Sequence, residues 1–142
     1  MKRLISITFA IIILATAFTA GAQQISAQSV IANIPFAFTA NNKTLPAGKY
    51  TITVLNSSSD RKALQIRSMD GRFSAMVLTN AVIGTISDDA KLVFERYDDR
   101  YFFAQAQMAG DSTTLAALKS NKDHKQAVAT AKKKTVVVIV AG

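Results

Sequence analysis

The sequence contains no cysteine and no tryptophan, only one histidine and only one glutamate. Without cysteine the chain has no disulfide, no thiolate zinc site, no iron–sulfur cluster and no cysteine nucleophile. A single histidine also excludes a metal site built from several imidazoles. Gly-x-Gly-x-x-Gly, Walker and Gly-x-Ser-x-Gly motifs are absent, which excludes the common nucleotide-binding loops and the hydrolase nucleophile elbow. We therefore expect no metal and no cofactor.

Residues 1–22 predict a secretory signal peptide. Lys2 and Arg3 form a basic start, residues 4–18 are an apolar run of 15 residues, and Ala20-Gly21-Ala22 matches the small-x-small cleavage pattern. The run is shorter than the ~20 residues that span a bilayer as a helix. We expect cleavage after Ala22, export to the periplasm or the extracellular medium, and no transmembrane span in the mature chain. An uncleaved N-terminal anchor is the alternative.

The positive charge of the chain is concentrated at its C-terminal end. The whole chain has a formal net charge of +8, from 17 basic and 9 acidic residues. Residues 23–118 carry nine basic and eight acidic side chains, whereas residues 119–142 carry six lysines and one aspartate. Residues 23–142 are too few for two full cores, so we expect a single, nearly neutral domain with a lysine-rich end.

Apolar residues recur at every second position along much of residues 29–108, which predicts short strands. The expected strands cover residues 29–39, 50–54, 64–68, 73–78, 92–97 and 101–108, with a further short strand at 82–86. Pro35 cannot donate a hydrogen bond to a strand partner, so it predicts an edge position or a bulge.

Two tight hairpins are expected among these strands. Asp70-Gly71 is typical of a two-residue type I′ turn, and its register places Ile66 opposite Ala75 and Leu64 opposite Val77. Asp98-Asp99 makes the second turn. Because no glycine is present there, a loop of three or four residues is favoured over a strained two-residue turn.

The pattern changes after Gly110. Asp111 or Ser112 can cap a solvated helix within residues 113–132, which contain neither proline nor glycine. Residues 135–141, TVVVIVA, predict a buried closing strand. About seven strands and one late helix predict an all-β domain, an antiparallel β-sandwich or a small barrel.

Two segments carry a resemblance to a known group of proteins. ANIPFAFTANNKTLPAGKYTI (residues 32–52) and KLVFERYDDRYFFAQ (residues 91–105) resemble small exported proteins of acidobacterial genomes. That group has the order signal peptide, IPF-x-F, LPAG-x-Y, DGR, LVF-x-RY-x-DRYF, charged helical stretch and aliphatic C-terminus. It often has glycine where this chain has Asp98 and histidine where it has Glu95, which argues against catalysis at this hairpin. The resemblance implies export and an all-β core but no chemistry, because the group has no assigned activity.

The densest group of aromatic and basic residues is the first candidate binding surface. It could bind a sugar or another flat ligand by stacking, or form a protein interface. The alternative is ordinary cross-strand pairing of aromatic rings, flanked by arginine. Its members are Arg96, Tyr97, Arg100, Tyr101, Phe102 and Phe103.

Six lysines form the second candidate surface, a basic patch that could bind an anionic envelope glycan or lipid. The alternative is a solvated helix end, where cations also favour the helix dipole. No nucleic-acid-binding motif accompanies the lysines, so we expect no nucleic-acid partner. The patch consists of Lys119, Lys122, Lys125, Lys132, Lys133 and Lys134.

The titratable residues suggest no catalytic site. His124 stands among polar residues, and Asp123 beside it points in another direction on a helix, so we expect an exposed histidine rather than part of a triad. The pairs Asp88-Asp89 and Asp98-Asp99 each lie in one turn, where they cannot bracket a sugar. Neither pair has the spacing of an EF-hand calcium loop.

These observations predict an exported binding or structural module of the cell envelope without catalytic activity. Its expected partner is an anionic glycan or lipid, or another envelope protein. One alternative is a hydrolase acting on a polysaccharide or an ester, which needs distant carboxylates such as Asp60, Asp70 or Glu95 to converge in a cleft. The other is a small barrel that holds an apolar ligand in its interior.

Overall fold

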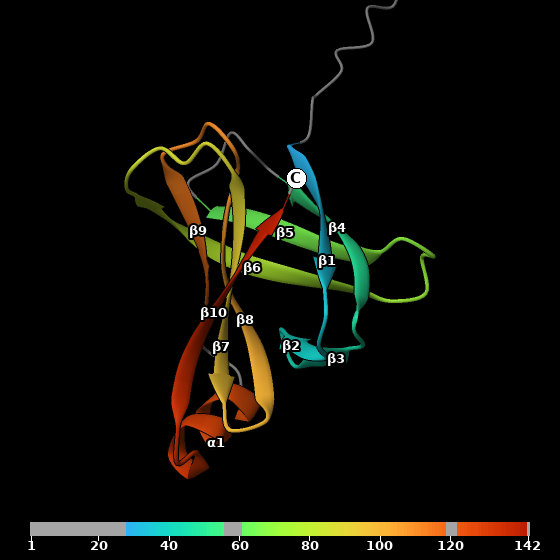
Figure 1. The fold of residues 1–142 in the computed structure, drawn as a ribbon, viewed down its shortest axis with the longest axis vertical. Coiled ribbons are helices and arrows are strands. Elements are labelled where there is room, and N and C mark those ends of the chain that lie inside the picture. The colour runs from blue at the N-terminus through green and yellow to red at the C-terminus, as the bar shows by residue number, and fades with distance from the viewer. Residues whose placement is uncertain (1–27, 56–60, 119–121, 142) are drawn as a thin grey trace, which may run out of the picture.

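The computed structural model describes residues 28–55, 61–118 and 122–141, so the expected signal peptide lies outside the described residues. The all-β fold class with one late helix is confirmed, although the described strands number ten rather than about seven (Figure 1). No helix in the described part of the chain is long and apolar enough to cross a membrane. The elements are β1 (Ser29–Ile34), β2 (Phe38–Ala40), β3 (Lys43–Leu45), β4 (Gly48–Leu55), β5 (Arg61–Ser68), β6 (Ser74–Ile83), β7 (Ala90–Tyr97), β8 (Arg100–Gln107), β9 (Thr113–Ala117), α1 (Lys122–Thr130) and β10 (Lys134–Ala141).

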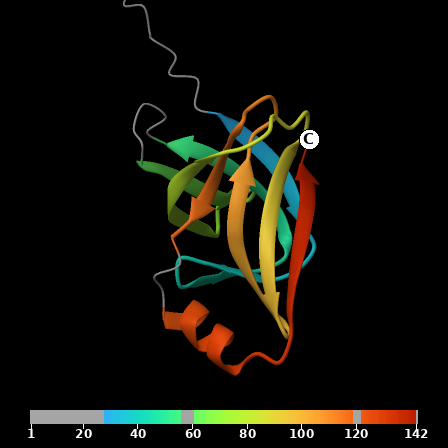
Figure 2. The same cartoon turned by 90° about the vertical axis from the view of Figure 1, so that its left-hand side faces the viewer.

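The strands form one large mixed sheet. Its order runs β1-β4-β5-β6-β9-β8, β8 also pairs with β2 and β7, and β10 pairs with β7. The pairing of β2 with β8 is parallel, and the other pairs are antiparallel. The sheet folds over so that β1 and β10 approach each other without pairing (Figures 1 and 2). The architecture is therefore sandwich-like, not a closed barrel.

Aromatic rings fill the centre of the core. The Phe94 ring, which is fully buried, makes edge-to-face contacts with Phe36, Phe38 and Phe103 at centroid distances of 5.1, 5.3 and 5.7 Å. Phe38 packs in the same way on Tyr50, at 5.3 Å. Each such pair adds about 0.5–1.5 kcal/mol beyond its buried area. The interior expected to hold a ligand in a small barrel is thus occupied by side chains.

The register of the first predicted hairpin is confirmed. In the β5–β6 pair, Ile66 lies opposite Ala75 and Leu64 lies opposite Val77. All four side chains are buried in the main core. Local alternation determined this register because a one-residue slip would turn the apolar face to solvent.

The turn of the β5–β6 hairpin differs from the predicted type I′ turn. Only Gly71 has a positive φ, +76°, and its N–H donates to the Ser68 carbonyl at 2.9 Å. The Asp70 carboxylate accepts hydrogen bonds from the Ser68 hydroxyl at 2.6 Å and from the Arg72 N–H at 3.0 Å. These side-chain bonds stabilise a longer loop, and the prediction of a two-residue turn was wrong.

The turn between β7 and β8 also differs from the prediction, because it is shorter than expected. It contains only Asp98 and Asp99, and Asp98 has a φ of +54°, which is unfavourable for a residue with a Cβ. The Asp98 carboxylate accepts hydrogen bonds from the backbone N–H groups of Lys132 and Lys133 at 3.3 and 3.2 Å. Its own N–H donates to the Lys133 carbonyl at 3.1 Å. These contacts with the segment between α1 and β10 offset the strain, so the expected longer loop is not needed.

The prediction of a helix within residues 113–132 was wrong for the first residues of that range. Thr113–Ala117 is strand β9, and α1 covers only Lys122–Thr130. Leu115 is buried between β6 and β8, where it lies opposite Ala81 and Ala106. Pairing on both edges therefore overrides the local helix signal. The Asp111 carboxylate accepts a hydrogen bond from the Thr113 N–H at 2.8 Å, at the start of the strand.

The closing strand predicted for residues 135–141 is confirmed as β10, but its burial is not. β10 pairs only with β7 and lies at an end of the sheet (Figure 2). Val136, Val138 and Val140 are therefore 57, 52 and 61% exposed, while the alternate residues pack on the core.

Two other predicted strands have different limits. The strand expected at 29–39 is interrupted at Pro35 and forms β1 and β2. Residues 82–86 form no separate strand, because Val82 and Ile83 are the last residues of β6.

Candidate functional site

The candidate aromatic–basic surface is packed into the domain. Tyr97, Phe102 and Phe103 are buried, and Tyr101 stacks on Phe36 with ring centroids 3.9 Å apart. The guanidinium groups of Arg96 and Arg100 lie over the rings of Tyr101 and Phe102, at 5.3 and 5.2 Å from their centroids. This is the alternative arrangement, in which aromatic rings pair within the sheet and arginines flank them.

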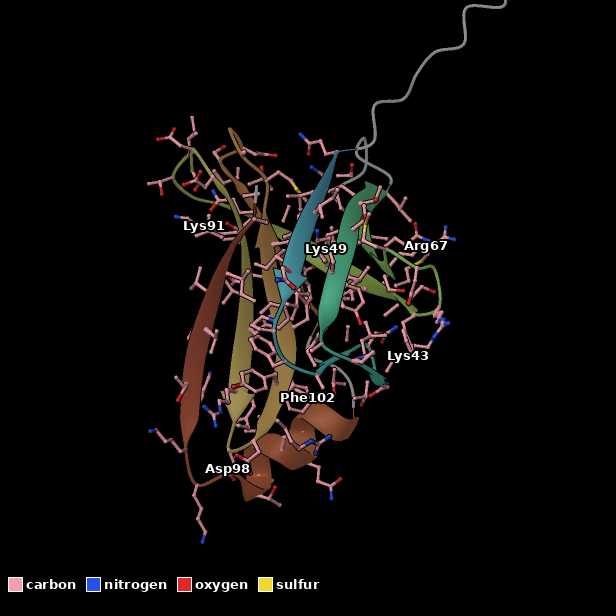
Figure 3. All side chains as sticks on the ribbon, turned by 45° about the vertical axis from the view of Figure 1, so that its right-hand side comes forward. Lys43, Lys49, Arg67, Lys91, Asp98 and Phe102 are labelled. Carbon is pink, nitrogen blue, oxygen red and sulfur yellow. The ribbon has the colours of Figure 1, made fainter. Side chains whose placement is uncertain are left out.

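His124 is not the exposed histidine that the sequence predicted. Helix α1 lies across the ends of β7 and β8, and Figure 3 shows Phe102 beside this helix. The His124 side chain is only 12% exposed, and its Nε2 lies 3.1 Å from Glu95 Oε2. Its ring makes edge-to-face contacts with Tyr97 at 5.5 Å and Phe102 at 5.4 Å. The polar sequence around His124 concealed this contact because the partners come from different elements.

Glu95 is the centre of a polar cluster that we call the Glu95 cluster: Glu95, Tyr97, His124 and, at its exposed edge, Lys134. Glu95 is 8% exposed, and its Oε2 accepts a hydrogen bond from the Tyr97 hydroxyl at 2.9 Å. Its Oε1 lies 3.7 Å from Lys134 Nζ. Lys134 Nζ also lies 5.7 Å from the centre of the Tyr97 ring. The carboxylate thus links β7, α1 and β10, and these partners compensate for its burial.

A pocket of about 70 Å³ lies beside the Glu95 cluster. Apolar and polar groups both form its wall: seven of the lining residues are apolar, and Thr39, Asn41, Glu95 and His124 contribute polar groups. The lining residues are Thr39, Asn41, Val77, Leu78, Glu95, Phe102, Phe103, Ala104, Ala117, Leu118 and His124.

The pocket arises where strand β8 changes its neighbour. On one edge β8 pairs with β2 up to Phe102 and with β9 from Gln105 onward, so neither register includes Phe103 or Ala104. On the other edge β7 pairs with Phe103 and Gln105 in succession, which leaves Ala104 as a β-bulge. Bulges commonly redirect side chains beside functional sites. Here the bulged residue lines the pocket.

Asn41 fixes one wall of this pocket. It has a φ of +48° in the turn between β2 and β3, a conformation that asparagine tolerates better than most residues. Its Nδ2 donates a hydrogen bond to the Met76 carbonyl at 2.9 Å, which ties the turn to β6.

The lysines of the basic patch whose side chains the structure describes are all exposed, and one of them also reaches Glu95. Lys134 Nζ lies 3.7 Å from Glu95 Oε1 although its side chain is 51% exposed, and Lys125, Lys132 and Lys133 are exposed as well. Lys119 and the side chain of Lys122 lie outside the described residues. Two other basic side chains, Lys43 and Arg67, lie on the side of the molecule away from β10 (Figure 3).

The carboxylates expected for a hydrolase do not converge. Asp60 lies outside the described residues, and Asp70 is at the tip of the β5–β6 hairpin. There the Ser68 hydroxyl, followed by the Arg72 N–H, holds the pKa of Asp70 below its ordinary value. Within residues 28–55, 61–118 and 122–141, no three His, Asp or Glu side chains are grouped so as to hold a metal ion. The carboxylate of the described residues that meets a histidine is Glu95, which contacts His124.

No family model matches this sequence, and neither the curated proteins nor the solved structures contain a match. The resemblance to small exported acidobacterial proteins therefore stays a prediction. The function must be argued from the pocket and the Glu95 cluster.

Proposed function

We propose that the protein is an exported binding module of the cell envelope that holds a small apolar group in the pocket beside β8, without catalytic activity. The observation that carries the proposal is a concave pocket with seven apolar lining residues and the Glu95–His124 pair at its wall, a combination that is typical of small-molecule sites. Strands supply most of the walls, and rigid elements hold a site more accurately than loops do.

The size of the pocket limits what enters it. Its volume of about 70 Å³ is about half that of a ~150 Å³ engineered cavity that binds benzene. Drug-sized ligands need about 300 Å³ or more. A short branched aliphatic group fits, while the remainder of a larger ligand would stay outside the pocket, near the exposed rim residues Leu78 and Leu118.

The binding of isobutanol, followed by methyl NMR, tests this function. We expect saturable shifts of the methyl signals of Val77, Leu78 and Ala104, because their side chains line the pocket. Ala117→Leu fills the pocket and should weaken binding at least tenfold, a loss of about 1.4 kcal/mol. Ala116→Leu is the matched control, because Ala116 lies in the same strand on the opposite face. Unshifted pocket methyls, or unchanged binding by Ala117→Leu, would contradict the proposal.

Export rests on the sequence of residues 1–22. N-terminal sequencing of the protein from its native host should begin at Gln23, and fractionation should place it in the periplasm or the medium. A protein that retains Met1 in the cytoplasmic fraction would contradict export.

A hydrolase acting on an ester or a polysaccharide is the second candidate. Glu95 and His124 form a titratable pair in a concave site, and a carboxylate-bound imidazole can act as a general base. We favour binding because Glu95 holds Tyr97 and Lys134 as well as His124, which gives the carboxylate a structural role. Turnover of p-nitrophenyl butyrate that is lost in Glu95→Gln would favour the hydrolase instead.

A further inference from the structure

Glu95 is the one acidic residue among the described residues that line the pocket. A buried carboxylate is costly unless cations or hydrogen-bond donors surround it. In many sites the ligand supplies that cation. Here Lys134, from the neighbouring strand β10, places its Nζ 3.7 Å from Glu95 Oε1, while His124 Nε2 lies 3.1 Å from Oε2.

We propose that the pocket selects uncharged ligands, because Lys134 supplies from within the protein the cation that Glu95 would otherwise draw from a ligand. This inference rests on the proposed function and names its ligand class: uncharged molecules that end in a short branched aliphatic group. Lys134 does not line the pocket, so it acts on the ligand through Glu95.

Both kinds of charged ligand meet an obstacle. An ammonium group in the pocket would compete with Lys134 for the same carboxylate. A carboxylate ligand would face Glu95, and none of the described residues that line the pocket is a lysine or an arginine. An uncharged group neither competes with Lys134 nor is repelled by Glu95, because the carboxylate keeps its partners when the ligand binds.

Three probes with the same branched head test the charge preference: isobutanol, isobutylammonium and isovalerate. Each is titrated into the purified protein at pH 7.5 and low salt, where electrostatic effects are least screened, and the pocket methyls are followed by NMR. The five to seven non-hydrogen atoms of these probes permit dissociation constants on the order of 1 mM. We expect isobutanol to bind at least fivefold more tightly than either ion.

Lys134→Met should change this preference. Removal of Lys134 takes one positive charge away from Glu95, which keeps its contacts with His124 and Tyr97. Isobutylammonium should therefore bind about fivefold more tightly than in the wild type, the scale of a partly exposed ion pair, while isobutanol changes less than twofold. Lys133→Met is the matched control: it removes the same charge one residue away, from an exposed side chain, and should change neither affinity. Lys134 is 51% exposed, and Lys134→Gln should reproduce Lys134→Met without adding an apolar side chain.

The outcomes separate this inference from the proposed function. If none of the three probes shifts the pocket methyls, the binding function itself is wrong. If isobutanol binds but either ion binds as tightly, the charge preference is wrong and the binding function stands. Equal effects of Lys134→Met and Lys133→Met on isobutylammonium would also overturn the role of Lys134.

Discussion

Replacement of His124 by alanine should release helix α1 from the sheet. The helix contacts the sheet through a small cluster in which Ala127 packs on Tyr97 and Phe102, and through the His124 ring. His124→Ala removes a contact of 3.1 Å to the Glu95 carboxylate and two edge-to-face ring contacts. A hydrogen bond to a charged group contributes about 1.5–3 kcal/mol, and each ring contact about 0.5–1.5 kcal/mol.

Helix α1 has only nine residues, and isolated helices of that length are unstable in water. The helix therefore depends on these contacts with the sheet. We expect the free energy that holds α1 on the sheet to fall by about 2 kcal/mol, after allowance for partial exposure, which lowers amide protection about 30-fold. Native-state hydrogen exchange of the α1 amides measures this change. The amides of Ile52 and Leu64, in the buried part of the sheet, should keep their protection.

Val128→Ala provides the control for this prediction. Val128 lies on the same helix, but its side chain is half-exposed, so its truncation should cost about 0.5 kcal/mol or less. The reasoning is refuted if α1 exchanges equally fast in both variants, or if His124→Ala lowers protection in β4 and β5 as much as in α1.

Three further changes test the core and the two turns. Phe94→Ala should lower the free energy of unfolding by about 3–5 kcal/mol in urea denaturation, whereas Phe73→Ala, at a side chain 40% exposed, should cost about 1 kcal/mol or less; equal losses would contradict the described core. Asp98→Ala should be about 1 kcal/mol less stable than Asp98→Gly, because both lose the carboxylate but only alanine is strained at positive φ. Ser68→Ala should raise the pKa of Asp70 toward its ordinary value, as read by a carboxyl NMR titration. Because the folded-state pKa of Asp70 is lowered, its carboxylate stabilises the fold above the unfolded-state pKa, and this stabilisation is lost as the pH falls through the folded-state pKa. Ser68→Ala should make this stabilisation smaller. An unchanged pKa of Asp70 would contradict the Ser68 hydrogen bond.

Local sequence patterns predicted the parts of the fold that depend on neighbouring residues. The alternation on both sides of Asp70-Gly71 determined the β5–β6 register, and the β-branched run at 135–141 determined β10. The same patterns failed where distant segments decide the conformation. β9 forms because β6 and β8 flank it, and the tight turn at Asp98 depends on the backbone of Lys132 and Lys133.

The candidate site was less predictable than the fold. Glu95 and His124 are 29 residues apart in the sequence and meet only because α1 folds back on the β7–β8 hairpin. The pocket depends on the change of partner along β8 and on the bulge at Ala104. Neither feature has a local sequence signature. The sequence offered one signal of a buried polar site: Glu95 lies within a segment whose alternating apolar residues predict a buried hairpin.

Diffraction from crystals of the protein under xenon pressure tests the central claim most directly, because xenon enters apolar pockets without any polar contact. We expect a xenon peak in van der Waals contact with Leu78, Phe103 and Ala117, and no such peak in Ala117→Leu. A pocket that stays empty while xenon fills other sites in the same crystal, or one closed by its own side chains, would contradict the account.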